Sequence, residues 1–114
     1  MIINSFEDII AWQKAKELTV TIYGLTASIK DYGYRDQLQR ASVSIMNNIA
    51  EGFERQSDKD FRKFLFIAKG SCSEVRSMLR LGESLGVIDK QTSDKLIKDS
   101  IEISRVLSGF IKSL

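Results

Sequence analysis

Polar residues recur along one side of a predicted helix in the stretch QRASVSIMNNIAEGFER, residues 39–55. Arg40, Ser44, Asn48 and Glu51 follow one another at spacings of four, four and three, which places them on one helical face. This polar stripe lies directly beside an apolar seam. Ser and Asn are mediocre helix formers, so their position needs a reason. The stripe is either a binding site or part of what holds the protein together.

Ser71 and Glu74 lie in the same way beside the seam of a later predicted helix. A buried polar group without a partner costs ~1–3 kcal/mol, so we expect these side chains to hydrogen-bond to one another. The planar donor fork of Arg40 suits the carboxylate of Glu51 or Glu74. Asn48 and Ser71 are placed to bridge the two helices. We interpret the six residues as a polar network that fixes helix register, and the alternative is a ligand or oligomer-contact site.

A second pattern consists of basic residues on one face of the third predicted helix, with no acid among them. Its members are Arg62, Lys69, Arg76 and Arg80, at spacings of seven, seven and four. Arg55 and Lys59 lie at the nearby corner between two helices, and Phe66 flanks the row. Lysine and arginine rows bind phosphate backbones by releasing counterions, without reading base sequence. The basic stripe therefore indicates RNA or DNA binding, strengthened if an oligomer repeats it around a ring.

The alternative for the basic stripe is a solvated helix face that meets acidic protein surface. Asp99 or Glu102 of a neighbouring subunit would then neutralise it. Binding that weakens steeply with salt would favour nucleic acid over such a protein partner.

Catalytic and metal chemistry is disfavoured by what the composition lacks. The chain contains no histidine, which is the commonest general base and metal ligand. Di-metal bundles need several glutamates with Glu-x-x-His motifs, which are absent here. Cys72 lies on an apolar seam without a basic partner and is expected to be a packed thiol. We predict no catalytic residue, no metal site and no cofactor.

Four segments show helical periodicity in their apolar residues, and short turn signals separate them. The expected helices cover residues 6–30, 36–53, 57–86 and 89–114. Capping-box spacings occur at Ser5 with Asp8 and at Ser57 with Asp60, Asp89 is a candidate cap, and Gly52 is a candidate left-handed cap. The expected seam of the last helix is Ile97, Ile101, Ser104, Leu107, Ile111 and Leu114.

These elements predict an all-α fold, an antiparallel up-down-up-down four-helix bundle that forms one domain over residues 1–114. The third helix carries more apolar residues than its seam needs, among them Phe66, Ile67, Leu81 and Leu85. A helix that is apolar on more than one side is central or buried against another subunit. Because no helix is central in a bundle of four, we expect a homo-oligomer.

The chain ends and hydropathy predict a cytoplasmic protein. The N-terminus MIINSFEDII has acids where a signal peptide needs basic residues, and no apolar run is long enough to span a membrane. One cysteine among 114 residues excludes an intrachain disulfide and fits a reducing compartment. The net charge of +2 permits nucleic acid as a partner without requiring it.

Three segments resemble the 23S rRNA intervening-sequence protein family: FEDIIAWQKAKELTVTIYGLT, QLQRASVSIMNNIAEGFER and KDFRKFLFIAKGSCSEVRSML. The specific matches are the SxxxNIAEGxxR core that begins at Ser44 and the GSxxE motif that begins at Gly70. The family usually has proline where this chain has Met46, which should leave the helix straighter without changing the fold.

The resemblance implies a left-handed bundle that assembles as a homo-oligomer, often a pentamer with a central channel. A similar bundle, the accessory variability determinant of diversity-generating retroelements, is a basic pentamer that works with a reverse transcriptase and nucleic acid. By analogy, the function expected here is a non-enzymatic RNA- or DNA-binding scaffold or accessory factor, acting alone or through a nucleoprotein partner and without a membrane. The alternative is a protein-interaction adaptor that binds no nucleic acid.

Overall fold

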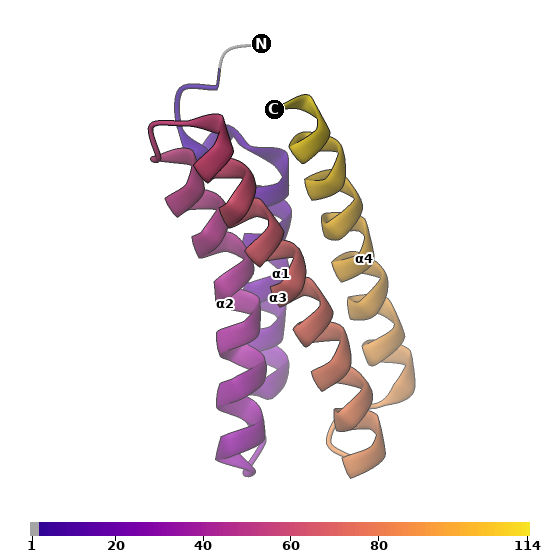
Figure 1. Ribbon diagram of the computed structural model, residues 1–114. Helices are drawn as coiled ribbons and strands as arrows, with labels where there is room; N and C mark the ends of the chain where they lie inside the picture. The colour runs from indigo at the N-terminus through magenta and orange to yellow at the C-terminus, as the bar shows by residue number, and fades with distance from the viewer. Residues whose placement is uncertain (1–2) are drawn as a thin grey trace.

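The computed structural model describes residues 3–114, which form four long helices and no strand. A short 3₁₀ turn, η1 (Phe6–Asp8), precedes α1 (Ile10–Thr26), α2 (Tyr32–Phe53), α3 (Asp58–Leu85) and α4 (Lys90–Ser113). The α1–α2 and α3–α4 connections lie at one end of the molecule, and the α2–α3 connection lies at the other end with both termini (Figure 1). Within the described residues, no helix combines the length and apolar content needed to cross a membrane.

The four helices form a bundle in which α1 packs against α2 and α4, and α3 packs against the same two helices. The bundle measures 43 × 21 × 19 Å. One continuous core fills its interior. Its largest fully buried apolar side chains are Ile22, Leu38, Ile45, Ile49, Leu65, Val75, Leu79, Leu96, Ile103 and Leu107. Most of these side chains belong to α1, α2 and α3, where the helical periodicity of the apolar residues supplies about one buried side chain per turn.

The predicted caps of the last two helices are confirmed. The Ser57 side chain accepts a hydrogen bond from the Asp60 amide, and the Asp89 side chain accepts one from the Thr92 amide. Gly86 ends α3 in a left-handed conformation with φ of 73°. The amide of Val87 then donates to the carbonyl of Gly82 over 3.0 Å, which satisfies a free carbonyl at the helix end.

The beginnings of α1 and α2 differ from the prediction. The first helix is interrupted because Ile9 is extended and buried, so the 3₁₀ turn ends there and α1 begins at Ile10. Ser5 caps the amide of Glu7 rather than that of Asp8. The second helix begins at Tyr32, four residues earlier than expected, because Asp31 accepts a hydrogen bond from the Tyr34 amide and acts as the N-cap.

Gly52 does not form the predicted left-handed cap. It lies inside α2, and Gly86 is the one residue with positive φ among those described. A Cβ atom at Gly52 would stand 2.6 Å from the Cβ of Phe64 and 2.9 Å from the ring of Phe61. The glycine therefore permits close approach of α3 to α2 rather than a turn.

The buried side of α4 also differs from the expected seam. Ile101 and Ser104 are half-buried, whereas Ser100 and Ile103 are enclosed. The Ser100 hydroxyl donates to the carbonyl of Cys72 over 3.0 Å, which satisfies a polar group inside the α3–α4 contact. Ser100 is thus more deeply buried than its neighbour Ile101, which the apolar pattern had placed in the seam.

Candidate nucleic-acid interface

The four arginine and lysine residues of the basic stripe line the edge of α3 that faces α4. Lys69 donates to the hydroxyl of Ser108 on α4 over 2.6 Å. Arg80 contacts the carboxylate of Asp94 on α4 over 3.0 Å. Arg62 and Arg76 are half-buried and lie on the same side of α3 by helical spacing.

A second row of cations, not predicted from the sequence, lies on α4. Lys98, Arg105 and Lys112 are exposed and spaced by seven residues. Helical spacing places them in one stripe with Asp94 and Ser108, the two residues that contact the basic stripe of α3. The spacing of seven was the available signal, but only the packing of α4 on α3 shows that the two rows adjoin.

We call this combined surface the basic face. It comprises Arg62, Lys69, Arg76 and Arg80 of α3 with Lys98, Arg105 and Lys112 of α4. Within residues 3–114, only Arg80 of this set forms ion pairs, with Glu83 and Asp94. Elsewhere ion pairs are frequent, and they engage Lys14, Arg35, Arg55, Lys63, Lys90 and Lys95. The basic face therefore carries mostly uncompensated positive charge.

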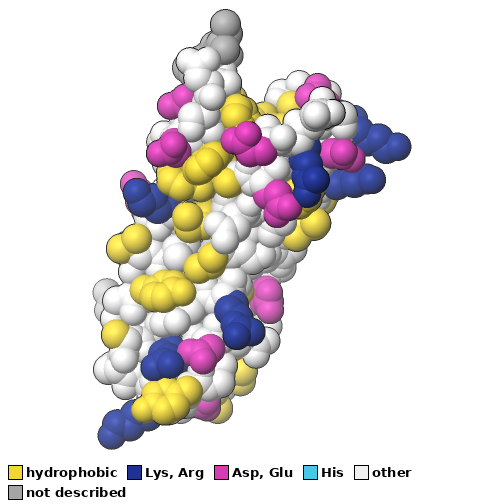
Figure 2. Space-filling model, turned by 90° about the vertical axis from the view of Figure 1, so that its left-hand side faces the viewer, with side chains coloured by type: hydrophobic (Ala, Val, Ile, Leu, Met, Phe, Trp, Pro, Cys, Tyr) yellow, Lys and Arg dark blue, Asp and Glu magenta, His cyan; other side chains and the backbone are white. Residues whose placement is uncertain are grey.

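The opposite side of the bundle differs in character. Figure 2 shows the face over α1 and α2, where basic and acidic side chains are interspersed among separate hydrophobic patches. Val20 and Tyr23 of α1 are among its exposed apolar residues. The mixed charges of this side contrast with the two rows of cations on the basic face.

The two predicted corner residues have different surroundings. Arg55 bonds to Glu51 over 2.8 Å and lies over the ring of Phe64 at 4.7 Å, so its charge is engaged on the α2 side. Lys59 is exposed and forms no ion pair within the described residues. It precedes Arg62 by three residues and extends the row on α3.

Three members of the predicted polar network meet between α2 and α3. The hydroxyls of Ser44 and Ser71 are 2.8 Å apart. The Asn48 amide donates to the Ser44 carbonyl over 2.8 Å and to its hydroxyl over 3.0 Å. Ser71 is buried, so the set satisfies polar groups inside a helix contact. Ser44, rather than Asn48, makes the link to α3.

Arg40, Glu51 and Glu74 are exposed and lie outside this set. Contrary to the prediction, Arg40 bonds to neither carboxylate within the described residues. Eleven residues of helix, or about 16 Å, separate it from Glu51. Glu51 pairs with Arg55 instead. Arg40 borders a shallow groove of about 380 Å³ with Tyr23 of α1.

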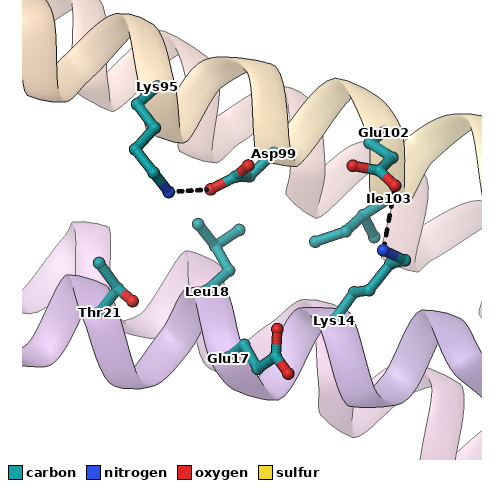
Figure 3. Close-up of a pocket in the computed structure, with 8 residues that line it drawn as sticks. All are labelled: Lys14, Glu17, Leu18, Thr21, Lys95, Asp99, Glu102 and Ile103. Carbon is teal, nitrogen blue, oxygen red and sulfur yellow. Dashed lines mark hydrogen bonds and ion pairs between the residues drawn. The ribbon is translucent and has the colours of Figure 1, made fainter.

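The cleft between α1 and α4 is lined by several charged side chains (Figure 3). It has a volume of about 200 Å³ and is crossed by one ion pair, Lys14–Glu102 at 3.0 Å, while a second pair, Lys95–Asp99 at 3.1 Å, runs along α4 at its edge. The hydrogen bond and charge of Glu102 raise the pKa of Lys14, so its amine stays protonated at neutral pH. A protonated amine is neither nucleophile nor base. The acids that the sequence analysis offered to a neighbouring subunit are engaged within this chain.

Cys72 and the acidic residues do not gather into one cluster in the part of the chain that the structure describes. No group of three potential metal ligands occurs among residues 3–114. Cys72 is buried, and its burial raises the pKa of the thiol to about 11. The thiol is therefore protonated at neutral pH, as expected of a packed core cysteine.

The sequence matches the profile of the family described as 23S rRNA-intervening sequence protein over residues 7–109, which is nearly the whole bundle. The chain belongs to the 23S rRNA-intervening sequence protein family. This confirms the resemblance carried by the motifs at Ser44 and Gly70.

A solved structure is similar to this chain in architecture. It is a protein of unknown function from the S23 ribosomal protein family of Bacteroides thetaiotaomicron. The two share 29% sequence identity with a TM-score of 0.84, and the similarity covers 90% of this chain and 99% of the other. A comparison with curated proteins finds no significant match. The family therefore establishes the fold, and the function must be argued from the surface of this chain.

Proposed function

We propose that the protein is a non-enzymatic, cytoplasmic, homo-oligomeric scaffold that binds the phosphate backbone of RNA or DNA. The observation that carries the proposal is the basic face, on which two adjoining helices present cations that, apart from Arg80, form no ion pair within the described residues. Of these, Lys98, Arg105 and Lys112 are exposed. Cations in such rows release counterions from a phosphate backbone, which gives affinity without reading base sequence.

The proposed oligomer is built from antiparallel, left-handed bundles through the apolar residues of α3. Phe66, Ile67, Leu81 and Leu85 are 58%, 51%, 44% and 51% exposed. Ile67 and Leu81 are fourteen residues apart and lie on the edge of α3 away from Lys69. Association through them would leave the basic face accessible. Family resemblance favours a pentamer, in which the basic face is repeated around a ring.

A protein-interaction adaptor is the second candidate. Ile97 and Ile101 line an apolar depression on α4 beside Lys98, and a mixed apolar and basic surface suits an acidic protein segment. Such a partner would depend less on salt than a phosphate backbone does.

Charge reversal on α4 tests nucleic-acid binding. The variant Lys98→Glu/Arg105→Glu/Lys112→Glu changes exposed residues that form no ion pair within the described chain, so we expect it to fold. Its affinity for single-stranded RNA and duplex DNA, measured by fluorescence anisotropy at ~50–200 mM salt, should fall at least about tenfold. The salt slope should become shallower by about two to three, because three phosphate contacts are lost.

The matched control is Lys16→Glu/Lys30→Glu/Arg40→Glu, which alters the net charge equally on exposed residues of α1, α2 and their connection. We expect its affinity to stay close to that of the wild type. Equal losses in the two variants would show that only net charge matters. Wild-type protein that binds neither nucleic acid would leave the adaptor as the better candidate.

A further inference from the structure

The groove between α3 and α4 holds two arginines and two hydroxyls at the centre of the basic face. Ser73, Arg76, Ser77 and Arg80 of α3 line it opposite Ile97 and Ile101 of α4. Its volume is about 330 Å³, and it is open to solvent. Residues four apart on a helix are neighbours, so each serine stands beside the next and each arginine beside the next.

Arg76 is held in this groove but lacks an anionic partner within the described residues. Its Nη2 donates to the hydroxyl of Ser73 over 3.0 Å. Its Nε is enclosed and has no hydrogen-bond acceptor. An enclosed Nε means that the stem of the side chain lies against the groove rather than moving freely in water. The end of the guanidinium, Nη1 with the second hydrogen of Nη2, remains available as a two-pronged donor.

The guanidinium of Arg80 is held one helical turn away from Arg76 by two carboxylates. Its Nη1 contacts Glu83 at 2.9 Å and Asp94 at 3.0 Å, and these hydrogen bonds raise the pKa of Arg80. Its Nε and Nη2 make no hydrogen bond within the described chain. The two acids near the groove are therefore both directed at one nitrogen of Arg80, and neither reaches Arg76.

We propose that this groove is a discrete phosphate-binding site, in which Arg76 binds one phosphate of a bound nucleic acid. Ser73 and Ser77 donate hydrogen bonds, and Arg80 offers the Nε and Nη2 donors that its two carboxylate partners leave unbonded. A phosphate suits the site better than a carboxylate, because its oxygens accept hydrogen bonds from several directions at once. This inference rests on the proposed function and deepens it, since it replaces a diffuse electrostatic contact with one defined contact.

The substitution Arg76→Lys tests the site because it keeps the charge and removes the two-pronged donor. We expect RNA affinity to fall about tenfold with an unchanged salt slope, since the number of cations stays the same. The matched control, Arg105→Lys, makes the same change at an exposed residue of the basic face with no hydrogen bond in the described chain. Its affinity should stay within about twofold of the wild type.

A second measurement is made on the wild-type protein. The Nε–Hε signal of Arg76 in the wild-type protein is assigned by its loss in Arg76→Lys. It should shift saturably when inorganic phosphate is added, and should not shift with chloride at equal ionic strength. Circular dichroism of Arg76→Lys checks that the helices remain intact.

The outcomes separate this site from the proposed function. If α4 reversal weakens RNA binding while Arg76→Lys matches Arg105→Lys, the basic face stands and the site is overturned. If phosphate shifts Arg76 but the protein binds no nucleic acid, the site serves free phosphate, and the inference as stated fails. Loss of affinity in Arg76→Lys alone, together with the phosphate shift, is the result that the geometry predicts.

Discussion

Tyr34 of α2 lies against Gly82 of α3. Its hydroxyl occupies the space that a side chain at position 82 would fill. The Tyr34 hydroxyl donates to the carbonyl of Met78 over 2.5 Å, and its ring is buried. A Cβ atom at Gly82 would overlap the Tyr34 hydroxyl and stand 3.0 Å from a methyl group of Ile88. Gly82 thus permits a hydrogen bond that fixes the start of α2 on α3.

The substitution Gly82→Ala is expected to lower the free energy of unfolding by about 2 kcal/mol, because the buried tyrosine cannot move without losing its hydrogen bond. Urea denaturation measures the change. Gly109→Ala is the matched control, since a Cβ atom there meets nothing within 4 Å. That control should gain about 0.5–1 kcal/mol from helix propensity. Equal effects at the two glycines would contradict this account of Gly82.

The contact between α2 and α3 depends on polar side chains as well as apolar ones. Ser44 bonds to Ser71 across the contact, and Asn48 bonds back to Ser44. The sequence predicted that these residue types were tied together, because serine and asparagine beside an apolar seam need partners. It did not predict which residues pair, because hydroxyl and amide groups can each hydrogen-bond to several neighbours. The relative position of α2 and α3 decides which of these hydrogen bonds form.

Asn48→Leu should lower the melting temperature relative to Asn47→Leu, with a difference in unfolding free energy of about 1 kcal/mol. The two substitutions are chemically identical and one residue apart. Asn47 is exposed and forms no side-chain hydrogen bond within the described chain, whereas Asn48 is half-buried and bonded. Thermal denaturation followed by circular dichroism gives the comparison. Indistinguishable melting temperatures would show that the hydrogen bonds add nothing.

The helices were more predictable than their ends. Ser57 and Asp89 act locally, so their capping roles could be inferred from residue type and spacing. The break at Ile9 and the role of Gly52 could not, because each depends on packing against a distant part of the chain. The buried side of α4 was misassigned for a similar reason, since Ser100 is buried only where the Cys72 carbonyl meets it.

At the scale of the whole molecule, the basic stripe and the exposed side chains of Ile67 and Leu81 lie on different sides of α3, whereas the exposed Phe66 lies beside the stripe. The basic row could be read from α3 alone, but its continuation through Lys98, Arg105 and Lys112 required the position of α4. The exposed apolar residues were predicted from their excess over the seam, and they are exposed in the single chain. Their coverage by a second copy remains a prediction.

Ile67→Glu/Leu81→Glu should convert the proposed oligomer to a monomer, because charged side chains would have to be buried in the contact. The control Ile10→Glu/Val20→Glu places the same charges on α1, at residues that are 60% and 64% exposed. We expect the control to keep the mass of the wild type. An unchanged mass in the α3 variant would mean that this surface is not the contact.

The most direct test of the central claim is the solution mass of the wild-type protein by light scattering, at low and high salt, with and without mixed-sequence single-stranded RNA. The account predicts a stable multiple of the 12.9 kDa chain at both salt concentrations. Added RNA should increase that mass at low salt and leave it unchanged at high salt. A mass that RNA does not change at low salt would contradict the proposed nucleic-acid scaffold, and a monomer would contradict the proposed assembly.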